Sequence, residues 1–220
     1  MPTTKPAPRD LIDSAPISES LRLLAHAGEV RRYAKGTVLI SEGDKGDTLF
    51  IILAGQLRAF SVNEDNNREI TYGVYDPGEY VGEMGLDGGA RSASVTALQT
   101  TVCARIERPT LVAHIAKHPE FAFELISKVI RRARAATLGL KHVALNDVYG
   151  RLKLLLESLT ATQPDGTRVI QPALTHRDMA QRLGCGREMV SRLMKDLERG
   201  GHVGVEAGRW VVIKWLPPRW

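Results

Sequence analysis

The sequence has only two cysteines, Cys103 and Cys185, and neither has partners at the spacing of a metal site. No apolar run approaches the ~20 residues that a membrane-spanning helix needs. Residues 1–20 contain four prolines and mixed charges but no apolar core of a signal peptide, so we expect a mobile arm there. These absences favour a cytoplasmic globular protein with reduced thiols, no metal and no membrane partner.

The chain of 220 residues carries a net charge of +5, and this charge is unevenly distributed. Residues 1–149 hold 18 basic and 18 acidic side chains, whereas residues 150–220 hold 12 basic and seven acidic ones. The whole excess therefore lies in the last third of the chain. A basic terminal domain beside a neutral body indicates a polyanionic partner that only this domain binds.

Between residues 28 and 106, short strand-like segments alternate with glycine-containing turns such as Asp76-Pro77-Gly78. Short strands spaced by about 8–12 residues are typical of a barrel or a sandwich. We therefore predict an N-terminal β-barrel of the jelly-roll type over residues 20–118. The strand-like segments are residues 37–40, 48–53, 56–62, 70–75, 94–98 and 101–106.

A helical period replaces the strand pattern after His118-Pro119, and it predicts a long helix over about residues 120–144. Its apolar residues recur at alternating steps of three and four, which is the seam of a coiled coil. Such a seam can pack on its own domain or pair with a second copy. The length of the helix and its small residues favour pairing, so we predict a dimerisation helix over residues 119–145. The seam consists of Ile126, Val129, Ala133, Ala136, Leu140 and Val143.

The strongest local signal is a helix-turn-helix over residues 174–197. Thr175 can cap the first helix, and Asp178 completes a pattern that resembles a capping box. Gly184 falls where the turn needs a positive φ. The second helix should bury one apolar face, which we assign to Met189, Val190, Leu193 and Leu197.

The opposite face of that second helix is suited to reading DNA. Arginine can donate two hydrogen bonds to guanine, and glutamate can accept one from cytosine. The alternative is a solvated face with intrahelical pairs, such as Glu188 with Arg192. The turn, the spacing and the basic charge favour DNA. The face presents Arg187, Glu188, Ser191, Arg192 and Lys195.

These residues make the chain resemble the CRP/FNR family of transcription regulators, over about residues 31–213. The resemblance implies that residues 146–220 form a winged helix-turn-helix domain that binds double-stranded DNA. It also implies that Arg187, Glu188 and Arg192 read base edges in TGTGA-type half-sites, and that residues 163–166 are the loop that touches RNA polymerase. The DNA-binding residues are then Thr175, Arg177, Arg187, Glu188, Ser191, Arg192 and Lys195.

A second motif, residues 78–86 followed by Arg91-Ser92, resembles the family's cyclic-nucleotide cassette. Alone, its Gly-Glu turn would be an ordinary β-turn. In a cassette, glycine N–H groups approach the cyclic phosphate, Arg91 pairs with it, Ser92 adds a donor, and Glu83 accepts from the ribose 2′-OH. The resemblance gives the ligand-binding residues as Gly82, Glu83, Met84, Arg91, Ser92, Ala136 and Thr137.

Two departures bear on the ligand. The segment from Glu83 to Arg91 is two residues shorter than in the family's cyclic-AMP-binding members, and Ala136-Thr137 keeps one of two hydroxyls on the long helix. Cyclic AMP is the first choice of effector and cyclic di-GMP the second. The two cysteines cannot supply the four thiolates of the family's iron–sulfur branch. A haem-sensing branch stays open, because His114 and His118 stand four residues apart.

The sequence therefore predicts an α+β protein: a cyclic-nucleotide-controlled, homodimeric transcription regulator. Three alternatives compete with this prediction. An enzyme is disfavoured, because no nucleophile motif or paired carboxylates accompany a glycine-rich pocket. A nucleotide-regulated subunit that binds another protein would leave the polar face of the second helix without a role. A DNA-binding regulator of the same fold that needs no ligand remains open.

Overall fold

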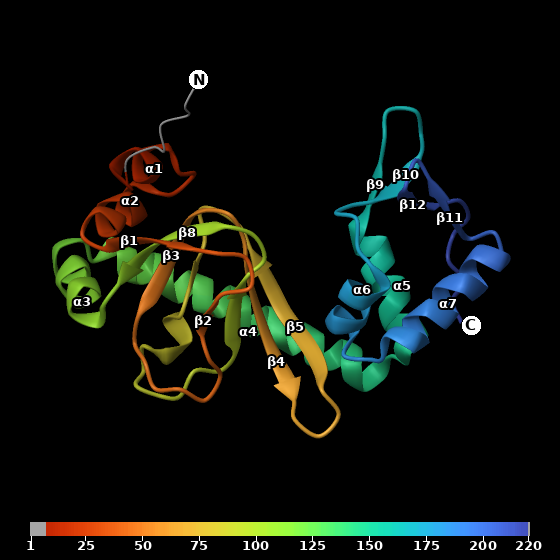
Figure 1. The fold of residues 1–220 in the computed structure, drawn as a ribbon, viewed down its shortest axis with the longest axis horizontal. Coiled ribbons are helices and arrows are strands. Elements are labelled where there is room, and N and C mark those ends of the chain that lie inside the picture. The colour runs from red at the N-terminus through yellow and green to blue at the C-terminus, as the bar shows by residue number, and fades with distance from the viewer. Residues whose placement is uncertain (1–7, 220) are drawn as a thin grey trace. The chain divides into compact units, whose positions relative to one another are not determined.

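The computed structural model describes residues 8–219 and divides into two compact units (Figure 1). The first unit contains residues 71–134 and the chain before residue 62, and the second contains residues 62–70 and the chain from residue 135 onward. The predicted α+β class, a β-rich domain followed by a long helix and a helix-turn-helix, is confirmed.

The β-rich unit is built on two four-stranded sheets. Five of the six predicted segments match strands within one residue at each end, and residues 70–75 match β5 from its third residue. The pattern missed two elements, β1 and the two-residue β6. The first sheet has the order β1 (Glu29–Tyr33), β8 (Thr101–Ile106), β3 (Leu49–Ala54), β6 (Tyr80–Val81). The second has the order β2 (Val38–Ile40), β7 (Ser94–Ala97), β4 (Leu57–Asn63), β5 (Arg68–Tyr75).

Strand β3 explains how this unit forms its core. Leu49 and Ile51 belong to a cluster with the helices, whereas Phe50 and Ile52 belong to the cluster that contains residues of both sheets. Successive side chains of a strand point to opposite faces. Because both faces of β3 are covered, its sequence is a continuous apolar run instead of an alternating one.

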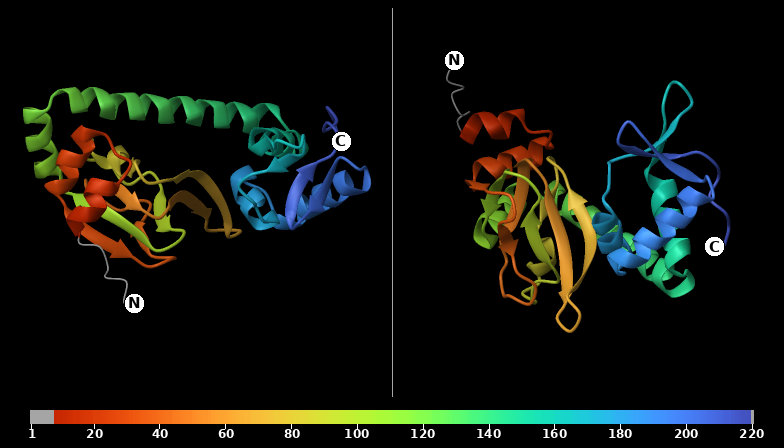
Figure 2. Two further views of the ribbon diagram at one scale, coloured as in Figure 1. Left: turned by 90° about the horizontal axis from the view of Figure 1, so that it is seen from above. Right: turned by 45° about the vertical axis from the view of Figure 1, so that its right-hand side comes forward.

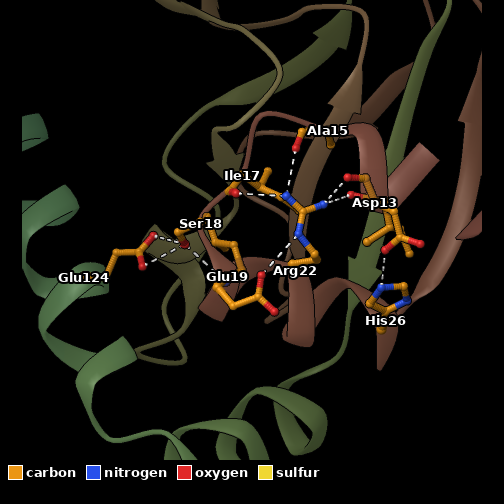
Figure 3. A network of polar contacts seen from close by, with 10 residues as sticks. Asp13, Ala15, Ile17, Ser18, Glu19, Arg22, His26 and Glu124 are labelled. Carbon is orange, nitrogen blue, oxygen red and sulfur yellow. Dashed lines mark hydrogen bonds and ion pairs between the residues drawn. The ribbon is translucent and has the colours of Figure 1, made fainter. Parts of the chain in front are cut away.

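The N-terminal segment corrects one prediction. Residues 8–20, expected within a mobile arm, contain helix α1 (Pro8–Ser14) and the start of α2 (Glu19–His26). Ile12 and Ile17 are buried in the core. The guanidinium of Arg22 donates hydrogen bonds to four backbone carbonyls of this segment (Figure 3). The apolar residues are too sparse to show a period, and they become buried only because a sheet face is there to cover. Residues 1–7 of the predicted arm lie outside the described residues.

Helix α3 (Arg108–Lys117) precedes α4 (Glu120–Leu145), which matches the predicted long helix within one residue at each end (Figure 2). Phe121 is fully buried at its start. Farther along, the predicted seam is exposed: Ile126 is 52% accessible and Leu140 is 70% accessible. Among the described helices, none combines the length and apolar character needed to cross a bilayer.

The second unit contains a small winged helix-turn-helix. Its core includes Leu152, Leu156, Ile170, Met179 and Leu197. The hairpin β9–β10 was not predicted. The helices are α5 (Val148–Leu159), α6 (His176–Leu183) and α7 (Arg187–Arg199). The sheet has the order β11 (Val203–Glu206), β12 (Arg209–Val212), β10 (Arg168–Ile170), β9 (Thr160–Thr162).

The buried face of α7 differs from the prediction in two residues. Val190, Met194 and Leu197 are completely buried, whereas Met189 is 39% exposed. The spacing of four and three follows the helical repeat of 3.6 residues. Met189 is adjacent to Val190 in sequence and therefore lies about 100° away around the helix. Met194, which the sequence reading omitted, takes its place in the core.

Candidate functional site

The cassette of the β-rich unit begins where β6 ends. Gly82 has a φ of 99° and directly precedes a short 3₁₀ turn, Glu83–Gly85. A Cβ atom at Gly82 would lie 2.4 Å from the carbonyl oxygen of Thr48. The backbone conformation and this close approach both require glycine, because larger residues rarely adopt such a φ and would collide.

Arg91 is buried beside this turn, with 7% of its surface accessible. Its Nη1 donates to the carbonyl of Gly82 at 2.7 Å, and its Nη2 donates to the carbonyl of Thr48 at 3.0 Å. Burial lowers the pKa of the guanidinium, which the neighbouring charges of Asp47 and Glu83 oppose. A guanidinium has five N–H donors, so these two bonds leave donors for an anion.

Glu83 is the second buried charge of the cassette. Its side chain is completely inaccessible, and its Oε1 forms an ion pair with Arg132 of α4. Arg132 also donates to the carbonyl of Tyr80 at 2.6 Å and lies over the ring of Tyr75 at 4.6 Å. Within the described part of the chain, the buried Oε2 of Glu83 has no hydrogen-bond partner. A buried carboxylate oxygen without a donor is a ready acceptor for a hydroxyl.

A second ion pair joins α4 to the cassette segment, residues 78–86. Lys128 of α4 binds Glu79, one helical turn before Arg132, and its ammonium lies 5.7 Å from the ring centre of Tyr80. The sequence analysis did not assign either basic residue to the cassette. The one sequence signal for these two ion pairs was a matched spacing: Lys128 and Arg132 are four residues apart, as are the two carboxylates.

The structure brings only part of the predicted ligand set together. Gly82, Glu83 and Arg91 meet in the cassette. Met84 is 50% exposed, and Ser92 is also exposed. Ala136 and Thr137 are exposed on the part of α4 that belongs to the second unit.

In the helix-turn-helix, the predicted capping box of α6 is confirmed. The hydroxyl of Thr175 accepts from the backbone N–H of Asp178 at 3.1 Å, and the Asp178 carboxylate accepts from the N–H of Thr175 at 2.8 Å. The Thr175 hydroxyl also donates to Asp178 at 2.6 Å. Gly184 ends the helix with the predicted positive φ of 63°. The geometry of the turn is therefore set locally.

The polar face of α7 is open. Arg187, Glu188, Arg192 and Lys195 are exposed, and Ser191 is half-buried. No ion pair among the described residues joins Glu188 to Arg192, which the solvated-face alternative had suggested. Arg177, on α6, is exposed as well. The face therefore offers charged donors and one charged acceptor that are not neutralised by each other.

A hollow of about 470 Å³ adjoins this face. Two of its residues, His176 and Trp210, were not predicted, because no motif links a helix start to a wing strand. His176 contacts both Ser191 and Trp210. The hollow is lined by Leu174, Thr175, His176, Arg177, Arg187 and Trp210.

His114 and His118, the basis of the haem alternative, lie together in the β-rich unit. Their ring centres are 4.7 Å apart, and His114 packs edge-on against Phe121. Burial lowers the pKa of His114, and the neighbouring His118 lowers it further. Burial also raises the pKa of the Cys103 thiol to about 12. Among these groups, His114 and Cys103 are buried, whereas His118 is half-buried beside Glu120. In the described residues, no group of three histidine, cysteine, aspartate or glutamate side chains could hold a metal.

Comparison with known families identifies two domains in this chain. Residues 30–118 match the cyclic nucleotide-binding domain, and residues 135–216 match the Crp-like helix-turn-helix domain. The cAMP-activated global transcriptional regulator Vfr of Pseudomonas aeruginosa is 32% identical over 201 residues, covering 87% of this chain and 92% of that protein. The chain therefore belongs to the CRP/FNR family of transcription regulators.

One further relative supports this assignment, and one solved structure shares the fold. The cAMP-activated regulator CRP of Salmonella typhimurium is 30% identical over 182 residues, covering 80% of this chain and 84% of that protein. The solved structure of the global regulator CLP of Xanthomonas campestris matches with a TM-score of 0.75 and 23% identity, covering 89% of this chain and 98% of that one. The latter likeness establishes the shared fold.

Proposed function

We propose that this chain is a homodimeric, sequence-specific transcription regulator whose affinity for TGTGA-like DNA half-sites is controlled by a cyclic nucleotide. Cyclic AMP is the first choice of effector and cyclic di-GMP the second. The single observation that carries the proposal is that one chain contains both a cassette with two buried charged groups, Glu83 and Arg91, and an open polar face on α7.

The cassette supports a nucleotide of one defined chemistry. Arg91 keeps N–H donors for a phosphate, and the free Oε2 of Glu83 suits a ribose hydroxyl. The relatives from Pseudomonas aeruginosa and Salmonella typhimurium, which are 32% and 30% identical, are both described as cAMP-activated. Met84 and Ser92 would complete the rim of the site, and Ala136 and Thr137 would contact the base.

The DNA-binding proposal rests on α7. Arg187, Glu188 and Arg192 would read base edges, while Lys195, Arg177 and Thr175 would contact the backbone. In a dimer, two such helices must stand about one DNA turn apart, ~34 Å. A nucleotide that prefers the DNA-competent state about a hundredfold contributes ~2.7 kcal/mol to that arrangement.

The dimer proposal rests on the exposed seam of α4. Ile126, Val129, Leu140 and Val143 leave apolar surface in water, and a second copy of the helix would cover it. We expect Leu140→Asp to shift sedimentation from dimer to monomer at micromolar concentration. Leu138→Asp is the matched control, because Leu138 is 55% exposed but faces away from the seam. Equal behaviour of the two variants would contradict the seam.

Fluorescence-anisotropy titration of a TGTGA-N6-TCACA duplex and a scrambled duplex tests the whole proposal. Each titration is run at fixed salt without nucleotide, with cyclic AMP and with cyclic di-GMP. We expect cyclic AMP to raise affinity for the operator while the scrambled duplex stays weak. Specific binding without any nucleotide effect would leave the ligand-independent regulator. Binding that never discriminates the two duplexes would refute the half-site assignment.

The proposed regulator acts in the cytoplasm, and its proposed contact with RNA polymerase is the loop 163–166 between β9 and β10. The Asp165 carboxylate accepts the N–H of Thr167 at 2.8 Å, a bond that lowers the Asp165 pKa. This bond and the backbone bonds of Gln163 with Thr167 and Gly166 stabilise the turn. We expect Gln163→Ala to leave operator binding unchanged and to lower transcription by reconstituted RNA polymerase. Unchanged transcription would remove this contact.

A further inference from the structure

The DNA-facing side of the second unit contains a contact between three elements that the proposed function does not require. Nδ1 of His176, the first residue of α6, lies 2.9 Å from Oγ of Ser191 on α7. The imidazole also stacks on Trp210 of β12, with ring centres 5.8 Å apart and an angle of 28° between the planes. One histidine therefore joins the first helix, the recognition helix and the wing.

We propose that His176 is a positioning residue for DNA recognition, which fixes the hydroxyl of Ser191 while Trp210 holds the imidazole plane. The inference rests on the proposed DNA-binding function. It makes the orientation of the Ser191 hydroxyl, one of the predicted DNA-binding groups, depend on a residue of a different helix.

The hydroxyl of Ser191 is directed by this contact. A serine inside a helix often donates to a carbonyl of its own preceding turn. In the described structure, the Ser191 hydroxyl is bonded to His176 instead. One hydrogen lies between Nδ1 and Oγ, and the tautomer of His176 decides which atom carries it. When the Ser191 hydroxyl donates to Nδ1, its oxygen can still accept a hydrogen bond from DNA. When the N–H of Nδ1 donates to Oγ, the Ser191 hydroxyl can donate its own hydrogen to DNA.

The location of the contact distinguishes positioning from simple stabilisation. Val190 and Met194 are completely buried and anchor α7 in the core without the histidine. Ser191 is half-buried and lies one turn after Arg187 on the same side of the helix. His176, Trp210 and Arg187 line the same hollow beside that face. The histidine therefore acts at the edge of the DNA-reading surface.

The test uses a double-mutant cycle on the full-length chain. His176→Phe keeps a ring for Trp210 but removes Nδ1, and Ser191→Ala removes the hydroxyl. The readout is the ratio of affinities for an operator and a scrambled duplex at fixed salt. We expect each variant to lower this ratio about three- to tenfold, the range of one hydrogen bond. The double variant should lose no more than either single one.

Two further variants complete the experiment. His176→Asn places an amide near the position of Nδ1 and should keep the ratio within about twofold of the wild type. Ser158→Ala removes an exposed hydroxyl that bonds only its own helix and should change nothing. Tryptophan fluorescence monitors folding, because all three tryptophans lie in residues 210–220.

The outcomes distinguish failure of the His176 role from failure of the proposed sequence-specific DNA binding. A wild-type ratio in His176→Phe overturns the inference, as do losses that multiply in the double variant. Equal weakening on both duplexes, or no rescue by His176→Asn, overturns it too. If the wild-type chain does not distinguish an operator selected from random DNA, the proposed DNA specificity itself fails, and the inference falls with it.

Discussion

The two candidate sites of this protein hold their charges in opposite ways. In the cassette, Arg91 and Glu83 are buried and bonded to other parts of the β-rich unit. On α7, Arg187 and Arg192 are exposed, and no described residue forms an ion pair with them. The cassette charges are therefore part of the fold as well as of the proposed ligand site, whereas the α7 charges are free to contact only the proposed DNA partner.

This difference follows from the size of the two partners. A small ligand must be surrounded, so the groups that bind it are buried, and buried charges need protein partners before the ligand arrives. DNA is larger than the domain and carries its own charge, so the cations that bind it can stay exposed to water, where they pay little desolvation free energy before binding. Substitutions in the cassette should therefore affect stability and binding together, and those on α7 only binding.

The largest effect is expected from Arg91→Ala. The variant removes the charge-assisted bonds to a phosphate, so cyclic AMP affinity should fall about a hundredfold or more. The nucleotide-dependent rise in operator affinity should disappear. Stability should also fall, because the carbonyls of Gly82 and Thr48 lose their donor. Isothermal titration calorimetry measures the affinity.

Arg91→Lys is the control for Arg91→Ala, since it keeps the charge but not the forked geometry, and we expect an intermediate affinity. If Arg91→Ala binds cyclic AMP like the wild type, the cassette is not the phosphate site. If cyclic AMP affinity changes but the free energy of unfolding does not, Arg91 does not contribute to stability, and the contrast with α7 fails for this residue.

The next effect is expected from Arg132→Met. Glu83 would remain buried without its cation, and this should lower the free energy of unfolding of the β-rich unit by about 3 kcal/mol. Adding Glu83→Gln should recover part of the loss. Urea unfolding followed by circular dichroism measures the change, while tryptophan fluorescence should report an unaltered second unit. An unchanged circular-dichroism transition would show that the ion pair contributes little.

A smaller, purely functional effect is expected from Arg187→Ala. Operator affinity should fall by ~1–3 kcal/mol, and discrimination at one guanine should relax. The unfolding transition should stay in place, because the side chain is exposed. Arg199→Ala removes the same charge from the last turn of α7 and should weaken both duplexes alike. Equal losses on operator and scrambled DNA in Arg187→Ala would contradict base reading.

The smallest effect concerns pH and His114. Burial and the charge of His118 lower the His114 pKa below its ordinary 6.5 in the folded state. The unfolded chain therefore binds a proton first as the pH falls, and stability should decrease below about pH 6.5. We expect the thermal midpoint of the β-rich unit to drop between pH 7.5 and 5.5, and to drop less in His114→Gln. Identical pH profiles would show that His114 is not responsible.

Much of the fold could be predicted because its signals are local. The capping box of Thr175, the positive φ of Gly184 and the period of α4 each depend on residues within a few positions of one another. The N-terminal helices were missed for the opposite reason. The few apolar residues there, among them Ile12 and Ile17, follow no helical period in a proline-containing segment, and only a sheet formed by later residues gives them a surface to cover.

The candidate sites divide along the same line. The sequence by itself determined which side chains lie on the polar face of α7, because the helical period places neighbours without reference to the rest of the chain. It located the cassette turn only through the resemblance of residues 78–86 and Arg91-Ser92 to the family's motif. Only the tertiary structure decided that Glu83 pairs with Arg132, 49 residues away, and that His176 meets Ser191 and Trp210. Such pairs form between elements, and no local spacing specifies which elements pack together.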